Sequence, residues 1–165
     1  MSQNIASAGY SRAQIILHWL IAALILFQLL VHDGIEEAWR ASHMGGAEAG
    51  NPLPHIVVGS AVLILAAVRL VIRLRHGAPP APAGQPAALG LLASAVHWGI
   101  YVLLFLIPIS GLVAWFGGVQ GAALVHGGPL RLLLIALVLV HIAGALVQQF
   151  LLRSGVLMRM FRPGN

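Results

Sequence analysis

Four apolar segments, each long enough to cross a lipid bilayer, constrain the fold of this chain more than any other feature. They cover about residues 13–32, 55–74, 95–116 and 130–152. About 20 helical residues, rising 1.5 Å each, span the roughly 30 Å hydrocarbon core of a membrane. Because 59% of the residues are hydrophobic and only 8% are charged, a soluble domain of this size could not bury the apolar surface. The sequence therefore predicts an all-α integral membrane protein, an up-down four-helix bundle that forms one transmembrane domain over residues 1–165.

The charged residues predict how these helices are oriented. The chain has no lysine, so all nine basic residues are arginines. Seven of them flank one end of the predicted helices: Arg12, Arg69, Arg73, Arg75, Arg153, Arg159 and Arg162. Arg40 and Arg131 lie on the other side, as do all four acidic residues, which fall in the first connector. The positive-inside rule then places both termini in the cytoplasm. The same rule explains the basic charge as a mark of orientation in the membrane, so we expect membrane lipid, and not nucleic acid, as a partner.

Histidine is the polar residue that most needs an explanation. Two of the eight histidines, His43 and His76, lie in connectors, where water can solvate them. The other six lie within the predicted spans or at their ends: His18, His32, His55, His97, His126 and His141. Polar groups at membrane depth are costly and usually face the bundle interior, where they pair or bind something. Because the chain has no cysteine and no acid within a span, iron held by two axial imidazoles of a haem fits better than a tetrahedral zinc cluster.

Helical spacing allows two such haems. His18 and His32 are fourteen residues apart, and His126 and His141 are fifteen apart. At about 100° and 1.5 Å per residue, each pair stays within roughly 60° of one face and rises about 21 to 22 Å. One helix can therefore offer a ligand to each of two haems stacked across the bilayer. The Gly-Gly-Pro stretch after His126 favours a bent turn there, with Pro129 in the first turn of the last helix. Depth alone does not assign the ligands.

Two glycines and two arginines complete the candidate site. Gly59 follows His55 by four residues and Gly144 follows His141 by three, so a flat ring could pass close to the backbone there. Close packing of helices is the alternative role for both glycines. Arg69 and Arg131 lie near the two membrane edges, where each could pair with a haem propionate. Otherwise Arg69 would extend its charge to the interface and Arg131 would anchor a helix end.

Four stretches match a known family in order and over nearly the whole chain. They are "YSRAQIILHWL", "PHIVVGSAVLILAAVRLVIRLR" with "APP" after it, "HWGIYVLLFLIPISGL" and "HIAGALVQQFLLRSGVLMRMFRP". With these stretches the chain resembles the bacterial cytochrome b561 family, which is related to the cytochrome b subunits of hydrogenases and formate dehydrogenases. The resemblance implies four iron ligands. His18 and His141 would bind the haem on the cytoplasmic side, and His55 and His126 the haem on the periplasmic side.

The chain departs from the family pattern in two places. The family usually has His-Glu fourteen residues before the last ligand, whereas this chain has "VHGGPLR" with one residue more. His97, which matches a histidine common in the third helix of the family, and His32 therefore remain candidates for the fourth ligand. The paired histidines that follow the last ligand in the family are Gln148 and Gln149 here. This departure leaves any proton or quinone role of that position open.

The resemblance implies transmembrane electron transfer through two b-type haems, in a multi-pass protein of the bacterial inner membrane. The electrons would pass between a periplasmic one-electron donor and membrane quinone. Some members of the family oxidise superoxide and reduce ubiquinone, which makes that activity one candidate, although no catalytic residue is identified. The acidic first connector favours exchange with a cationic periplasmic protein such as a c-type cytochrome. A third alternative is a haem-binding membrane anchor for a larger dehydrogenase.

Overall fold

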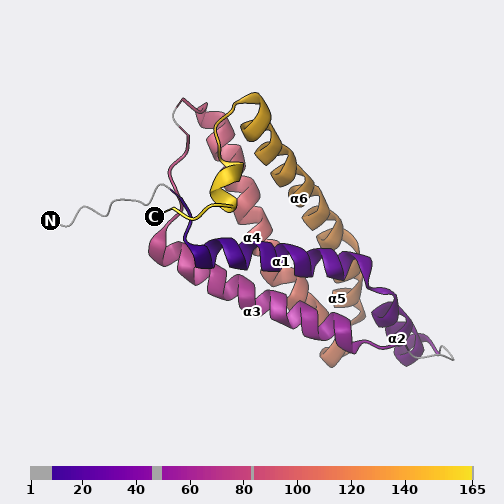
Figure 1. Cartoon of the computed structure of the whole chain (residues 1–165). Coiled ribbons are helices and arrows are strands. Elements are labelled where there is room, and N and C mark those ends of the chain that lie inside the picture. The colour runs from indigo at the N-terminus through magenta and orange to yellow at the C-terminus, as the bar shows by residue number, and fades with distance from the viewer. Residues whose placement is uncertain (1–8, 46–49, 83, 165) are drawn as a thin grey trace.

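Four long apolar helical rods make up most of the protein (Figure 1). A computed structural model of the chain describes residues 9–45, 50–82 and 84–164. Helices α1 (Arg12–Leu30), α3 (Leu53–His76) and α4 (Ala87–Gly117) form the first three rods. The fourth runs without a break through α5 (Gln120–Val125), η1 (His126–Leu130), α6 (Arg131–Leu146) and η2 (Val147–Leu151). The described residues contain no strand, so the predicted all-α class with four membrane-spanning helices is confirmed.

Neighbouring rods pack in chain order. Helix α1 packs along α3, α3 along α4, and α4 along α5 and α6. A small apolar core joins the first three rods, with Ile21, Val62, Ala66 and Leu104 at its centre. In the described part of the chain, neither α1 nor α3 packs its backbone closely along α6. Most of the large apolar side chains face outward, as expected for helices surrounded by lipid.

One end of the bundle carries the start of α1 and the end of the chain, and we call it the arginine-rich end (Figure 1). Helix α1 begins with a capping box, in which Ser11 Oγ accepts from Gln14 N and Gln14 Oε1 accepts from Ser11 N. The C-terminal residues fold back onto this helix and the residues just before it, because Trp19 Nε1 donates to Met160 O over 2.8 Å and Gly164 N donates to Tyr10 O over 3.1 Å. Both ends of the described chain are thereby tied to α1.

A short amphipathic helix, α2 (Asp33–Met44), covers the opposite end of the bundle, which we call the α2 end (Figure 1). Ala38 of this helix is buried, while its Asp33, Glu36 and Glu37 are exposed. The helix ends where Gly45 adopts the left-handed conformation that glycine accepts without strain. Residues 33–44 of the first connector are thus helical, and three of its acidic side chains, those of Asp33, Glu36 and Glu37, are exposed on this helix.

The fourth rod begins earlier than the sequence suggests. Its helix starts at Gln120, so Pro129 lies inside the rod and not in its first turn. His126 begins the π-helical segment η1, which contains Gly127, Gly128 and Pro129. A π-turn is an α-helix widened by one extra residue, and this width accommodates the proline where a regular turn would clash with it. The Gly-Gly-Pro stretch after His126 is therefore a π-helical bulge within a continuous rod.

Candidate functional site

Three histidines come together in the half of the bundle nearer the arginine-rich end. His18 comes from α1, His97 from α4 and His141 from α6. The ring centroids of His18 and His141 are 6.1 Å apart, and those of His97 and His141 are 5.0 Å apart. His97 is also held by its own helix, because its Nδ1 is hydrogen-bonded to the carbonyl of Ala93. His141 is therefore the residue shared by two possible pairs.

A separate pair lies at the α2 end. His55 stands in the first turn of α3 and His126 at the start of η1, with ring centroids 5.9 Å apart. The Nδ1 of His126 lies 2.7 Å from the carbonyl oxygen of Ile107 and 3.3 Å from Ser110 Oγ. Because a carbonyl oxygen only accepts, His126 Nδ1 carries the proton. In the neutral ring, Nε2 is then the unprotonated nitrogen, which can bind a metal.

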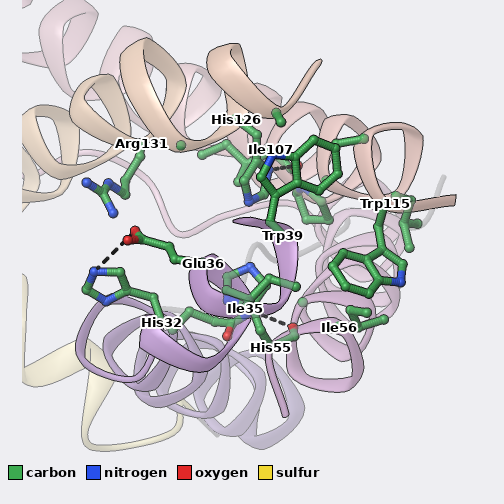
Figure 2. Close-up of a pocket in the computed structure, with 18 of the residues that line it drawn as sticks. His32, Ile35, Glu36, Trp39, His55, Ile56, Ile107, Trp115, His126 and Arg131 are labelled. Atoms are coloured by element: carbon green, nitrogen blue, oxygen red, sulfur yellow. Dashed lines mark hydrogen bonds and ion pairs between the residues drawn. The ribbon is translucent and has the colours of Figure 1, made fainter. Parts of the chain in front are cut away.

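A cavity of about 700 Å³ surrounds the His55–His126 pair, a size typical of ligand and cofactor sites. Figure 2 shows its labelled wall residues, with Trp39 and Trp115 on one side and Arg131, Glu36 and His32 gathered on another. His32 Nε2 lies 3.6 Å from Glu36 Oε1. Helix α2 contributes several of these wall residues, so the cavity lies between the bundle and its amphipathic cover.

The two predicted glycines have different surroundings. A Cβ atom added at Gly59 would lie 3.0 Å from Gln28 Nε2, whereas one added at Gly144 would meet no atom within 4 Å. The backbone of Gly59 is therefore approached by a side chain of α1, although the residue also lines the cavity. At Gly144 the space beside the backbone is open.

The two predicted arginines also differ. Arg69 donates from Nη1 to the backbone carbonyl of Gln14 near the start of α1. Arg131 lines the cavity, where Figure 2 shows its guanidinium on the same side as the carboxylate of Glu36. His32, at the start of α2, lines the cavity too, with its ring turned to Glu36.

Sequence reasoning missed several residues that shape the site. Gly111 is one, because a Cβ there would lie 2.8 Å from His126 Cε1. Ser110 and Ile107 hold His126 from the same part of α4, and Gln28 contacts the backbone of His55. A serine and a glycine side by side in an apolar helix were the available signal. Their role depends on which helix faces them, and the chain order of residues does not show that.

The paired rings fit a b-type haem. Metal–imidazole nitrogen bonds of about 2 Å on both sides of one iron would place two ring centroids roughly 6 Å apart. The His18–His141 and His55–His126 separations of 6.1 and 5.9 Å match this distance. Each pair also joins rods whose backbones are not closely packed, which leaves room for a flat ring. No group of three or more His, Asp or Glu residues in the described segments could hold a metal ion alone, whereas the porphyrin of a haem supplies four ligands of its own.

Four apolar spans with paired imidazoles between them define the class of this molecule as a membrane-bound cytochrome of the b type. The sequence model of the prokaryotic cytochrome b561 family matches residues 9–163, and the chain belongs to this family. Its membership assigns it to membrane electron transport and implies b-type haem as its cofactor.

Two curated relatives are similar over different lengths. The chain is 38% identical over 158 residues to cytochrome b562 of Cereibacter sphaeroides, which covers 94% of this chain and 96% of the relative. It is 33% identical over 109 residues to a protein of Yersinia pestis described as the probable superoxide oxidase CybB, covering 62% of this chain and 56% of that protein. The first similarity extends over nearly the whole membrane domain.

Proposed function

We propose that the protein transfers single electrons across the bacterial inner membrane through two b-type haems. His18 and His141 would ligate the haem nearer the arginine-rich end, and His55 and His126 the haem at the α2 end. The observation that carries this proposal is the presence of two imidazole pairs, each about 6 Å apart between ring centroids, at different depths of one bundle. The last rod supplies one ligand to each pair.

The residues of this chain hold and orient the ligands. The Ile107 carbonyl and Ser110 hydroxyl fix the ring of His126 through Nδ1, which leaves Nε2 of the neutral imidazole as the nitrogen that would bind iron. When bound, haem would supply one-electron redox chemistry, and two histidine ligands for each haem would disfavour oxygen binding. The apolar rods around the pairs would provide a low-dielectric setting for the haems and so tune their potentials.

Two arginines are suited to bind haem propionates. Arg131 lines the cavity around the α2-end pair, and its planar guanidinium matches a carboxylate. Arg69 comes from α3 and uses one nitrogen for the Gln14 carbonyl, which leaves other N–H groups to donate. We assign Arg131 to the haem at the α2 end and Arg69 to the other haem.

The ligands are tested by exchanging one histidine at a time for alanine and measuring haem content and midpoint potentials. His18→Ala and His141→Ala are expected to remove the same spectral component, and His55→Ala and His126→Ala the other one. His76→Ala, at the end of α3, serves as the control that leaves both components in place. If His97→Ala loses a haem while His18→Ala retains both, then His97, and not His18, is the ligand that pairs with His141.

We infer membrane quinone, with ubiquinone as the first candidate, as the acceptor and a periplasmic one-electron donor. Superoxide is the first candidate donor, supported by the printed name of the Yersinia pestis relative and by the position of Arg131 in the cavity wall, since a positive group attracts an anion. The test is superoxide-dependent reduction of ubiquinone by purified protein. Heat-inactivated haem protein is the control, because free haem reacts with superoxide by itself.

A cationic redox protein, such as a c-type cytochrome, is the second candidate partner. The exposed Asp33, Glu36 and Glu37 on α2 support it, because opposite charges accelerate encounter at low salt. If this partner is correct, the rate of electron exchange with a cationic cytochrome falls steeply as salt rises. Replacing Asp33 and Glu37 by their amides should remove most of that dependence, and an unchanged dependence would rule out docking on α2.

A further inference from the structure

Two buried polar atoms without hydrogen-bond partners lie on neighbouring residues at the α2 end. They are Nδ1 of His55 and Oε1 of Gln28. Both residues line the cavity. The amide of Gln28 is held at residue 55, because its Nε2 donates to the His55 carbonyl over 2.8 Å. One orphaned atom is a possible donor and the other an acceptor, and burying either without a partner costs free energy.

The backbone of α3 makes room for this amide. A Cβ atom at residue 59 would lie 3.0 Å from Gln28 Nε2, which is tighter than an ordinary contact. Glycine at residue 59, one turn after His55, therefore allows the side chain of α1 to reach the first turn of α3. Without that space, Gln28 could not donate to the His55 carbonyl in its present position.

The two histidines of this pair are supported unequally. His126 donates its Nδ1–H to the Ile107 carbonyl, whereas His55 Nδ1 has no partner among the described residues. Metal-ligating histidines almost always donate their second ring N–H, which fixes the ring and raises the basicity of the ligand. His55 therefore lacks the support that such a ligand needs.

We propose that Gln28 is the positioning residue of His55, accepting the Nδ1–H of the bound imidazole at its Oε1. The proposal rests on the proposed ligation of haem by His55. A hydrogen bond to Nδ1 makes the imidazole a stronger electron donor, which favours ferric over ferrous iron. Gln28 would therefore lower the midpoint potential of the haem at the α2 end while leaving the other haem unchanged.

His32 offers a competing partner for the same oxygen. It lies one turn further along the chain from Gln28, and its Nδ1 is also buried without a partner. Its Nε2 faces Glu36 and Asp33. The Gln28 amide is bonded at residue 55, and we therefore favour His55. The variant His32→Ala separates the two possibilities.

Potentiometric titration of the full-length, haem-loaded protein tests the proposal. Gln28→Leu removes the acceptor at similar volume and should raise the potential of the α2-end haem. Gln28→Glu keeps an acceptor and strengthens it, so it should lower the same potential. The component lost in His55→Ala identifies this haem. Gln148→Leu, in the π-helical segment η2, is the matched control in which neither potential moves.

The outcomes separate this proposal from the ligand assignment. If His55→Ala retains both haems, the ligation itself is wrong. If His55→Ala loses one haem, the ligation stands. Only the role of Gln28 is then overturned if the two Gln28 variants leave the midpoint potential of the α2-end haem unchanged or shift it in the same direction. A shift in His32→Ala without one in Gln28→Leu also overturns it. If Gln28→Leu loses the haem at the α2 end, the test rests on Gln28→Glu alone. Any result other than a lower midpoint potential of that haem in Gln28→Glu then contradicts the proposal.

Discussion

At the scale of single residues, Gly111 controls where His126 can lie. The ring of His126 occupies the space that any larger residue at position 111 would need, 2.8 Å from the added Cβ. The same ring is fixed by Ile107 and Ser110 in the turn before it. Residues 107–111 of α4 therefore fix the position of the His126 side chain, which comes from the fourth rod.

Gly111→Ala is expected to displace His126 and remove the haem at the α2 end. Overpacking of this kind costs about 1–3 kcal/mol, so the rods should still assemble while roughly half of the haem is lost, as expected when the support of a metal ligand fails. Haem content and the reduced-minus-oxidised spectrum give the measurement. Gly121→Ala is the control, because a Cβ there meets no atom within 4 Å. Equal haem content in the two variants would contradict the role of Gly111.

Residue types could be predicted better than residue partners. The cost of burying imidazole is a property of the residue and its depth, so the sequence could single out six histidines: His18, His32, His55, His97, His126 and His141. The choice of four ligands among them came from the family resemblance. The sequence could not show that His141 lies near both His18 and His97. Nor could it show that Gln28 approaches Gly59, because this depends on the rotation of α1 against α3.

At the scale of elements, the π-turn η1 explains the extra residue between His126 and His141. A π-turn takes up one inserted residue without rotating the helix beyond it. The fifteen-residue interval, which ends with eleven residues of α6, can therefore present both rings much as a regular fourteen-residue interval would. A sequence reading that assumes uniform α-helix cannot find such a turn, since one Gly-Gly-Pro stretch is equally typical of a break.

Deleting Gly127 together with the substitution Pro129→Ala, which removes the clash of the proline with a regular turn, should convert η1 to a regular turn and retain both haems. The matched control is deletion of Ala136, which lies within α6 and would rotate His126 relative to His141 by about 100°. We expect the control to lose one haem component and the Gly127 deletion to keep both, as judged by redox titration. Retention of both components in the Ala136 deletion would show that the register of the rod does not determine ligation.

At the scale of the whole molecule, the number of rods follows directly from the hydropathy pattern. The pattern does not show which rods pack against one another. Long apolar runs with polar connectors leave few alternatives to four spans, since the bilayer fixes the length of each. The helix α2, within the first connector, has a weaker pattern, and its position over the cavity depends on contacts with distant residues such as Trp115. Local periodicity contains no information about those contacts.

The charge asymmetry predicts that the arginine-rich end faces the cytoplasm. Because the chain has no cysteine, single-cysteine variants can be labelled on a clean background. Ser42→Cys, in α2, should react with a membrane-impermeant maleimide in cells with a permeabilised outer membrane. Ala81→Cys, in the second connector, should react only after the inner membrane is opened. The reverse labelling pattern would show that the opposite end faces the cytoplasm.

The position of His126 and His141 on the last rod has a consequence for biosynthesis. A nascent chain that has inserted only three spans contains His18, His55 and His97 but no member of the fourth rod. Neither 6 Å imidazole pair can form until the ribosome has synthesised the fourth rod. A product truncated before the fourth rod would therefore carry only one candidate ligand of each proposed pair.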